Sequence, residues 1–419
     1  MSFLTEDQTR SIAHQFGTPV YVYSQEELNR ACNNLKSCPG VDSVRYAMKA
    51  LPTMAILQII TQQGLKIDAS SGYEVMRAMD AGILAKDIQL TSQEMPADLV
   101  KLISQGVIFN ACSLQQLRTY GELLQQHKQR CLSVRINPGL GSGHCGKTNV
   151  GGPSSSFGIW HQKLPEVKEI AAHYGLTINR LHTHIGSGSD PDVWVKVADM
   201  SLAIAEQFPM VKVLNLGGGL KVGRMPDEKS IDLKKCGLAI KQAFRNFELN
   251  TGRHLKLEIE PGTYVVATAG VLICRVIDIV DTLPDKDGLH FLKVDTGMTE
   301  IARPTLYGAQ HPMELFFADK NQRPLLPNQN YVVSGHCCES GDILTPAPGD
   351  PNTIATRTFP RAAVGDFIVI GGAGAYCSSM PICGYNSFPE PPEVLIRNDG
   401  SIMLIRQRQT LEQLTQNEL

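Results

Sequence analysis

The feature that most constrains the fold of this chain is a repeated alternation of strand-like and helix-like segments over its first 260 residues. Strand candidates begin near Val41, Leu65, Asp87, Val107, Leu132, Thr177, Val211 and Leu255. Between them, apolar residues recur at helical spacing in Met54–Gln63, Tyr73–Ala81, Leu114–His127, Val193–Gln207 and Leu233–Phe247. A closed parallel barrel needs eight strands and roughly 250 residues. The alternation therefore favours an α/β fold, a (β/α)8 TIM barrel, with an open Rossmann-like sheet as the alternative.

The pattern changes after Pro261, and 419 residues are too many for one ordinary core. Strands without intervening helices are predicted at Val265–Val280, Leu289–Val294, Tyr331–Ser334, Asp366–Ile370 and around the hairpin signal Asn398-Asp399-Gly400. A capping box at Ser24-Gln25-Glu26-Glu27 predicts a helix that runs to about Lys36. We expect residues 1–24 to pair with the β domain, residues 25–264 to form the barrel, and residues 265–419 to form a C-terminal β domain.

The amino-acid composition argues against nucleic acids and membranes as partners of this chain. The net charge is −2, and no basic stripe supports a nucleic-acid or membrane-surface partner. Eleven cysteines are scattered without a C-x-x-C pair, which predicts free thiols and no metal site. The N-terminus lacks the pattern of a secretory signal, and no apolar run is long enough to cross a membrane. A cytoplasmic enzyme acting on a small molecule is expected.

Polar or ionisable residues close the predicted barrel strands. Active sites of such barrels lie at the C-terminal ends of the strands. The residues found there are Lys49, Asp68, Arg135, His184, Asn215 and Glu260. A lysine at a strand end more often reaches into solvent, but a partly desolvated lysine can form a Schiff base with an aldehyde cofactor. The convergence of six such residues predicts a site.

Two glycine-containing loops predict a bound phosphate. Leu216-Gly217-Gly218-Gly219-Leu220 follows a strand and offers bare backbone N–H groups. Ser187, shortly after His184, adds a hydroxyl at another strand end. Neither a Walker loop nor a G-x-G-x-x-G fingerprint is present, which disfavours nucleotides. A lysine, a histidine, a carboxylate and a phosphate cradle together indicate pyridoxal phosphate, whose ring nitrogen needs an acidic partner.

Ordered motifs along nearly the whole chain resemble the fold-type III pyridoxal-phosphate decarboxylases, which have an alanine racemase-like barrel and act on ornithine, lysine, arginine or diaminopimelate. The similarity is greatest to members that act on diaminopimelate. The motifs are Thr18-Pro19-Val20-Tyr21-Val22-Tyr23, Tyr46-Ala47-Met48-Lys49-Ala50, Asp68-Ala69-Ser70-Ser71-Gly72-Tyr73-Glu74, His184-Ile185-Gly186-Ser187, Gly217-Gly218-Gly219, Glu260-Pro261-Gly262, Arg303-Pro304-Thr305-Leu306-Tyr307, Cys338-Glu339-Ser340-Gly341-Asp342, Gly374-Ala375-Tyr376 and Tyr385-Asn386-Ser387.

The resemblance implies roles for individual residues. Lys49 would hold the cofactor aldehyde, His184 would stack on the ring, and Glu260 would pair with the ring nitrogen. The implied cofactor site also includes Asp68, Arg135, Ser187, Gly217, Gly218, Gly219 and Tyr376. Arg303, Tyr307, Glu339 and Tyr376 would bind substrate, and Cys338 would act as general acid. The family completes its site across a homodimer interface, with Cys338 and Glu339 contributed by the second subunit.

Three departures from the family pattern leave the substrate open. Thr263 stands where the family has arginine after Glu-Pro-Gly, Ser156 where it has lysine, and Leu51 where asparagine is common. A relative acting on lysine, ornithine or a siderophore or antibiotic intermediate is an alternative, and the long loop from Gly139 to Ser156 would admit a bulkier substrate. An amino-acid racemase and a non-catalytic regulator are weaker alternatives, because no second base is evident and both Lys49 and Cys338 are present.

Overall fold

The computed structural model describes residues 3–127, 130–143, 149–186, 190–284, 287–319 and 327–419. The chain divides into two compact units. The barrel unit comprises residues 29–222 and 229–265, and the β unit comprises residues 1–28, 223–228 and 266–419. The short segment 223–228 thus belongs to the β unit, although it interrupts the barrel sequence.

Within the described residues, eight parallel strands of the barrel unit close on themselves. They are β2 (Ser43–Ala47), β3 (Lys66–Ala69), β4 (Ile88–Leu90), β5 (Ile108–Ala111), β6 (Cys131–Asn137), β8 (Thr177–His182), β9 (Val213–Asn215) and β10 (Lys256–Ile259). Their order is β5-β4-β3-β2-β10-β9-β8-β6, and a β5–β6 pairing closes the ring. A short strand, β7 (Ile159–Trp160), pairs with β6. The predicted barrel is confirmed, and the open sheet is excluded.

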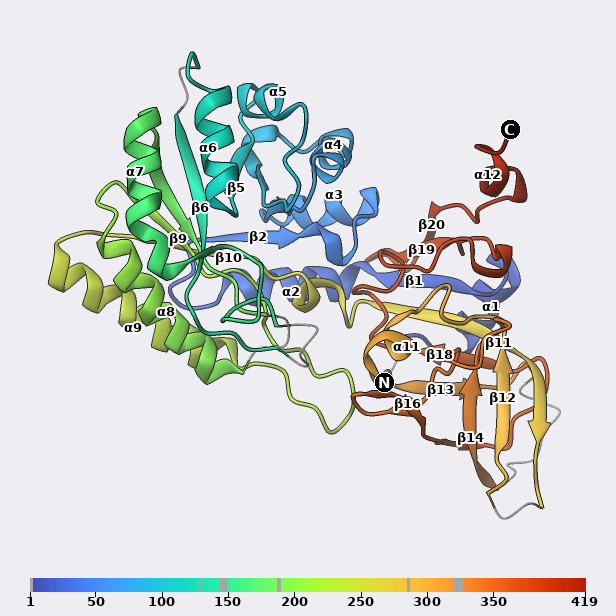
Figure 1. Ribbon diagram of the computed structural model, residues 1–419. Helices are drawn as coiled ribbons and strands as arrows, with labels where there is room; N and C mark the ends of the chain where they lie inside the picture. Colours follow the sequence, from blue (N-terminus) through green and yellow to red (C-terminus); the bar gives the residue numbers. More distant parts are fainter. Residues whose placement is uncertain (1–2, 128–129, 144–148, 187–189, 285–286, 320–326) are drawn as a thin grey trace. The chain divides into compact units, whose positions relative to one another are not determined.

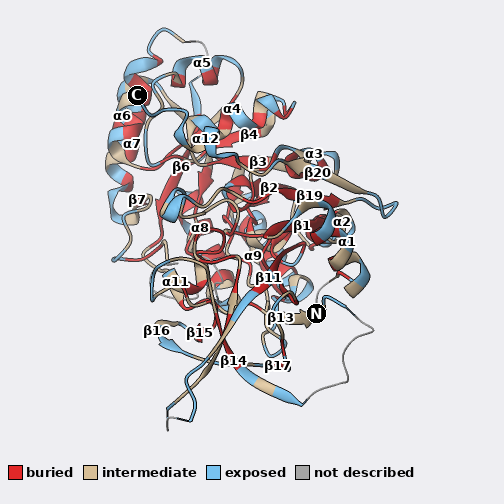
Figure 2. Cartoon of the chain, turned by 90° about the vertical axis from the view of Figure 1, so that its right-hand side faces the viewer, coloured by how far each residue is buried: buried red, intermediate tan, exposed pale blue. Residues whose placement is uncertain are grey.

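Helices cover the outside of the barrel. They are α3 (Met54–Gln62), α4 (Gly72–Asp80), α5 (Leu99–Ser104), α6 (Leu114–Leu123), α7 (Leu164–Tyr174), α8 (Pro191–Glu206) and α9 (Leu233–Thr251), and α2 (Gln25–Lys36) precedes them. Ser71, Ser113, Asp190 and Asp232 cap the N-termini of α4, α6, α8 and α9 with their side chains. Figure 1 shows α6 beside α7 and α8 beside α9. The strands inside this layer are buried, whereas the helices carry exposed residues on their outer faces (Figure 2).

The β unit is built on a mostly antiparallel sheet. Its strands are β1 (Val20–Ser24), β11 (Gly270–Asp281), β12 (His290–Val294), β13 (Met313–Phe316), β14 (Asn328–Ser334), β17 (Arg357–Pro360), β18 (Phe367–Ile370), β19 (Glu393–Ile396) and β20 (Ile402–Arg406). The main order is β17-β14-β12-β11-β1-β19-β20, while β18 pairs with β11 and β13. β15 (Pro346–Ala347) and β16 (Asp350–Ile354) form a separate pair, and α1 (Glu6–Phe16), α11 (Arg303–Tyr307) and α12 (Leu411–Thr415) are short helices.

The N-terminal strand lies inside this sheet. β1 pairs antiparallel with β11 and parallel with β19. Its side chains Val20 and Val22 pack in an apolar cluster with Ile12 of α1, Val271 and Val394. Burial of such side chains stabilises the fold by about 1.5–3 kcal/mol each. Residues 3–24 are therefore an integral part of the β unit.

One predicted strand begins later than expected. Residues Thr263–Val266 form a single helical turn, α10, and the strand starts only at Gly270. Val265 and Val266 favour a strand by propensity, but burial in this turn overrides that preference. The predicted hairpin is confirmed: Arg397 N–H donates to the Ser401 carbonyl at 2.9 Å, and Gly400 adopts a φ of 80°. No helix in the described ranges has the length and apolarity needed to span a bilayer.

Candidate active site

Lys49 lies in a 3-10 turn, Met48–Ala50, directly after β2. Its neighbours Met48 and Ala50 are buried, whereas Lys49 itself is exposed. The positive charge of Lys49 acts on the titration of Asp68 and His184, so the barrel brings these three residues together.

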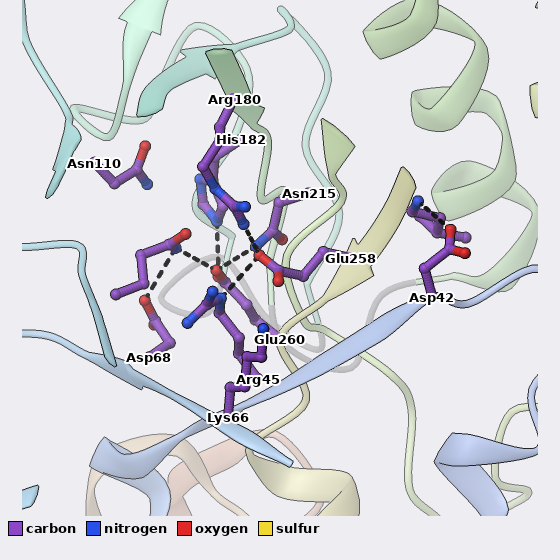
Figure 3. A network of polar contacts seen from close by, with 12 residues as sticks. Asp42, Arg45, Lys66, Asp68, Asn110, Arg180, His182, Asn215, Glu258 and Glu260 are labelled. Carbon is purple, nitrogen blue, oxygen red and sulfur yellow. Dashed lines mark hydrogen bonds and ion pairs between the residues drawn. The ribbon is translucent and has the colours of Figure 1, made fainter. Parts of the chain in front are cut away.

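Glu260 follows β10 and is the centre of a buried hydrogen-bond network (Figure 3). Its Oε1 accepts hydrogen bonds from Gln89 Nε2 and from Asn215 Nδ2, both at 2.6 Å. Its Oε2 lies 2.7 Å from His182 Nε2. These three donors come from β4, β9 and β8 and fix the orientation of the carboxylate.

The network keeps Glu260 ionised. Burial raises the pKa of Glu260, but the charge and hydrogen bond of His182, together with the charge of Arg45, outweigh burial and lower the pKa to about 2. Asp68 shows the opposite shift: burial and the negative charge of Glu260 raise its pKa well above the ordinary value. Asp68 accepts from Thr91 Oγ1 at 2.8 Å. Of these two carboxyl groups, Glu260 therefore carries the negative charge, whereas the raised pKa of Asp68 favours its protonated form.

A second buried carboxylate, Glu258, lies two residues earlier on β10. Arg45 Nε lies 2.9 Å from Glu258 Oε1, and Arg180 Nη2 contacts the same oxygen. Asn215 Nδ2 donates to Glu258 at 3.0 Å and to Glu260 at 2.6 Å, so it links the two carboxylates. The ion triplet therefore supports the side chain that holds Glu260.

His184 follows β8 and is a neutral ring. Burial and the positive charges of Arg135 and Lys49 lower its pKa well below the ordinary value. Its Nδ1 is buried and has no hydrogen-bond partner within the described part of the chain. Arg135, on β6, packs over the Phe157 ring at 5.1 Å. An uncharged imidazole of this kind can stack on another aromatic ring without a cost for burying charge.

The glycine loop after β9 packs directly against these residues. Gly217 has a φ of 66°, and a Cβ there would lie 2.6 Å from both His184 Cβ and the Thr183 carbonyl oxygen. A Cβ on Gly218 would lie 2.3 Å from the Glu260 carbonyl oxygen. The amides of Gly218 and Gly219 donate no hydrogen bond to any described residue. Adjacent free amides of this kind can bind a phosphate. Ser187, the other predicted phosphate residue, lies outside the described residues.

The described ends of the loop from Gly139 to Ser156 are anchored near the same strands. Asn137 Oδ1 accepts from the amides of Gly139 at 3.1 Å and Gly152 at 2.9 Å. The amides of Ser142 and Val150 both donate to the Ile185 carbonyl at 3.1 Å. This loop therefore meets the chain next to His184, at the C-terminal ends of β6 and β8.

The predicted substrate residues lie in the β unit. Arg303 and Tyr307 begin and end α11, and Thr305 Oγ1 of that helix donates to the Gly341 carbonyl at 3.1 Å. That bond links α11 to the loop carrying Cys338 and Glu339, which are both exposed. Cys338 is thus not the small buried hydrophobe that a free cysteine usually is. Within the described residues of one chain, Arg303 and Glu339 form no ion pair.

Tyr376, the other predicted residue of the β unit, has a left-handed backbone with a φ of 57°. Gly374, two residues before Tyr376, is required, because a Cβ there would lie 1.8 Å from the Val266 carbonyl oxygen. A non-glycine residue in this conformation costs roughly 1–3 kcal/mol, and such strain is typical of functional positions.

The segment carrying Thr263 packs against the Lys49 turn. A Cβ on Gly262 would lie 3.1 Å from both the Ala47 carbonyl oxygen and Ala50 Cβ. Residue 263 therefore follows a tight contact with the turn that presents Lys49. A substitution at this position acts close to the reactive amine.

Sequence reasoning missed the second carboxylate, Glu258, and the side chains that contact Glu258 and Glu260. These are Arg45, Gln89, Arg180, His182 and Glu258, all on barrel strands. The available signal was the position of charges in the strands: Arg45 and Glu258 each lie between two apolar residues, and Arg180 and His182 alternate with Leu181 shortly before His184. In the described part of the chain, no three His, Cys, Asp or Glu side chains gather as metal ligands.

The barrel site fits the predicted pyridoxal phosphate. Among the described residues only His182 occupies Glu260 Oε2, which leaves that oxygen able to accept from a protonated ring nitrogen. The neutral His184 suits an aromatic ring, and the amides of Gly218 and Gly219 suit a phosphate. The ring nitrogen, the ring face and the phosphate of the cofactor would each find a side chain or amide of matching chemistry here.

Comparisons with known proteins agree with this chemistry. Residues 25–267 match the family model described as pyridoxal-dependent decarboxylase, pyridoxal binding domain. The chain is 34% identical to diaminopimelate decarboxylase of Escherichia coli over 99% of this chain and 97% of that protein. A crystal structure of a diaminopimelate decarboxylase superposes with a TM-score of 0.91 at 34% identity, covering 99% of this chain and 97% of that one.

A further crystal structure, of diaminopimelate decarboxylase from Helicobacter pylori in complex with L-lysine, has a TM-score of 0.85 at 26% identity. It covers 97% of this chain and 98% of that one. Family model, relatives and fold therefore agree over essentially the whole length of the sequence. This chain belongs to the pyridoxal-dependent decarboxylases, and its cofactor is pyridoxal phosphate.

Proposed function

We propose that this chain decarboxylates meso-diaminopimelate to L-lysine and CO2. The observation that carries the proposal is the ionised, threefold hydrogen-bonded Glu260 beside a neutral His184 and the free glycine amides. Pyridoxal phosphate supplies an aldehyde that combines with amines and a ring that accepts the electrons left when CO2 departs. A carboxylate kept negative at the ring nitrogen favours that electron flow.

Each proposed cofactor residue has a role that follows from its side-chain chemistry. Lys49 supplies the amine that holds the aldehyde until substrate replaces it, and its exposure in the free chain gives substrate access to it. His184 supports the ring face, and Glu260 holds the proton on the ring nitrogen. The remaining proposed cofactor residues are Asp68, Arg135, Ser187, Gly217, Gly218, Gly219 and Tyr376.

Cys338 is the proposed general acid that returns a proton to the substrate carbon after CO2 has left. Its thiol is exposed, and its backbone N–H donates to Asn386 Oδ1 at 2.9 Å, which fixes the turn that carries it. Glu339, the next residue, is exposed as well and is proposed to bind the distal ammonium group. Both residues are available to meet a partner molecule.

We therefore propose a homodimer in which Cys338 and Glu339 complete the site of the other subunit. Mixing separately inactive Lys49→Ala and Cys338→Ala proteins, with subunit exchange, should restore activity. A random mixture of subunits predicts about a quarter of the wild-type rate, because half the dimers are mixed and each has one intact site. A mixture that stays inactive while exchange is demonstrated would count against the shared site. The cytoplasmic location expected from the sequence stays a prediction.

Arg303 and Tyr307 are proposed to bind the distal carboxylate of diaminopimelate. A guanidinium fork suits a carboxylate, and Arg303 has no carboxylate partner in the described part of its own chain. The Escherichia coli relative is named for the same substrate. Similarity over nearly the full length supports extending that substrate to this chain.

Thr263 favours a second candidate, a decarboxylase of lysine, ornithine or another pathway intermediate. The family arginine at this position is replaced next to the Lys49 turn. A lost charged hydrogen bond to substrate would cost about 1.5–3 kcal/mol. A substrate without the second carboxylate would not incur that loss.

The direct test is a CO2-release panel with meso-diaminopimelate, both enantiomers of lysine, ornithine and arginine. Lys49→Ala should abolish release and should also abolish borohydride-trapped cofactor on that residue. Lys101→Ala, at an exposed position on α5, is the matched control and should behave as wild type. If wild type carries trapped cofactor but releases no CO2 from any substrate, the decarboxylase proposal is wrong. A racemase would instead convert one enantiomer into the other.

A further inference from the structure

The segment Gly223–Glu228 presents one arginine to the β unit. Arg224 Nε donates to the Gly372 carbonyl at 3.1 Å. Its side chain lies so close to Gly372 that a Cβ on that glycine would be 3.0 Å from Arg224 Cγ. Glu228 Oε2 accepts from the backbone amides of Arg224 at 2.8 Å and Met225 at 3.1 Å. The position of this guanidinium is therefore well defined.

Arg303 is attached to the neighbouring residue of the same stretch. Its Nε donates to His311 Nε2 at 3.4 Å, and His311 Nδ1 donates to the Gly371 carbonyl at 2.9 Å. His311 is fully buried, and burial with the charges of Arg303 and Arg224 lowers its pKa well below the ordinary value. This imidazole is neutral and links Arg303 to the backbone that also holds Arg224.

The two guanidinium groups lack a matching negative charge. Neither Arg224 nor Arg303 forms an ion pair with a carboxylate in the described ranges. Arg224 Nη2 is buried and donates no hydrogen bond there. Burial and the nearby charge of Arg303 lower the pKa of Arg224 to about 9. Burial also raises the pKa of the neighbouring Cys377, so that thiol remains neutral.

Such an arrangement is costly for the free protein and favourable for an anion. A buried donor without a partner and two close like charges both cost free energy that a bound carboxylate would recover. Guanidinium groups bind carboxylates through paired N–H donors. Among the described residues, Glu228 is the carboxylate whose charge acts on Arg224, and it already accepts two backbone amides. The missing partner is therefore expected to come from a ligand.

We infer that Arg224 is a specificity-determining residue that binds the distal carboxylate of the substrate together with Arg303. The inference rests on the proposed function and narrows its substrate class to amino acids that carry a second carboxylate. Two cations at this site disfavour a substrate end that carries only an ammonium group.

The test compares Arg224→Gln, which removes the charge, with Arg224→Lys, which keeps it. For Arg224→Gln, the KM for diaminopimelate should rise about tenfold to a hundredfold, the range for one charged hydrogen bond, with a smaller change in kcat. The kcat/KM for lysine should stay the same or rise. Arg224→Lys should recover part of the loss. Arg408→Gln is the matched control, because Arg408 is also half-buried and donates to a backbone carbonyl, that of Pro19, at 2.8 Å.

Binding measured without turnover separates this inference from the proposed function. Pimelate has two carboxylates and no amine, so calorimetric titration reports carboxylate binding in the holoenzyme even if diaminopimelate is not a substrate. Wild type should bind pimelate about tenfold or more tightly than Arg224→Gln. Equal affinities, or a loss of kcat/KM that is the same for diaminopimelate and lysine, would overturn the inference. Failure of CO2 release by wild type would instead overturn the proposed function.

Discussion

The barrel unit and the β unit differ in whether their buried or half-buried charged side chains have partners of opposite charge or hydrogen-bond donors. In the barrel, Glu258 is paired with Arg45 and Arg180, and Glu260 accepts three hydrogen bonds from side chains. In the β unit, Arg224 and Arg303 have no carboxylate partner among the described residues. Where the cofactor ring is proposed to bind, the charged side chains are therefore paired or hydrogen-bonded within the chain itself. Where substrate is proposed to bind, the guanidinium groups have no carboxylate partner among the described residues.

This difference has a physical basis. A cofactor that stays bound through every cycle benefits from a rigid, preorganised carboxylate. A substrate must bind and leave, and its recognition is sharper when the site has unsatisfied groups that only the correct ligand pairs. The unpaired guanidinium groups therefore reduce the stability of the free protein, whereas the hydrogen-bonded Glu260 increases it.

The largest effect is expected from Glu260→Gln. The change removes the negative charge at the proposed ring-nitrogen partner and keeps the size of the side chain. CO2 release should fall by about 10²–10⁴-fold, the range for a positioned proton-transfer group, while borohydride still traps cofactor on Lys49. Glu248→Gln, at an exposed site of α9, is the control. Unchanged turnover in Glu260→Gln would show that the network serves stability alone.

Glu258→Gln should destabilise the barrel, because it removes the carboxylate that pairs with Arg45 and Arg180. It leaves the buried guanidinium of Arg45 and the half-buried guanidinium of Arg180 without their carboxylate, so the free energy of unfolding should fall by about 3–5 kcal/mol. Arg224→Gln, in contrast, removes an uncompensated charge and should change this free energy by less than about 1 kcal/mol. Urea denaturation of the two variants at one pH provides the measurement. Equal destabilisation by both changes would remove the contrast between the units.

Acid should weaken the contribution of Glu260. Its pKa is lowered from 4.5 to about 2 in the folded chain, so its stabilising effect is fully present above about pH 4.5 and is lost as the pH falls toward 2. The difference in unfolding free energy between wild type and Glu260→Gln should be constant near pH 6 and should shrink between pH 4.5 and 3. A difference that stays constant over this range would show that folding does not lower the pKa of this carboxyl group.

The smallest effect on the proposed cofactor site is expected from Gly217→Ala. A Cβ would collide with His184 and the Thr183 carbonyl, and the positive φ adds strain, for a cost of about 1–3 kcal/mol. Cofactor affinity should fall because the loop and His184 move apart. Gly400→Ala is the control: Gly400 also has a positive φ, but an added Cβ there has no neighbour within 4 Å, so the cofactor affinity should stay unchanged. Equilibrium dialysis of pyridoxal phosphate measures both variants.

Much of the barrel was predictable because its strands and helices are encoded locally. All eight predicted strand starts lie within two residues of the observed strands or at their first residue. Lys49, Asp68, Arg135, His184, Asn215 and Glu260 were predicted as strand-end residues, and the barrel topology explains why they lie on one end. Their individual roles in binding the cofactor stay predictions.

The charge pairs were not predictable, because they depend on which strands become neighbours. Arg45 and Arg180 are remote in sequence from Glu258, and only the β2-β10-β9-β8 order brings them to one carboxylate. Arg224 was missed for a related reason: it lies in a loop after the glycine run, with no local signal that it packs on Gly372. The helical turn at Thr263–Val266 was missed because β-branched residues favour strands by propensity.

The most direct test of the account is the ratio of kcat/KM for meso-diaminopimelate to that for lysine, measured for both lysine enantiomers. Lysine is diaminopimelate without its distal carboxylate, so the ratio reports what the unpaired guanidinium groups recognise. The account predicts a ratio of about a hundred or more, because a site built to pair a polar group rejects a ligand that lacks it. A ratio near one, or a preference for lysine, would contradict it.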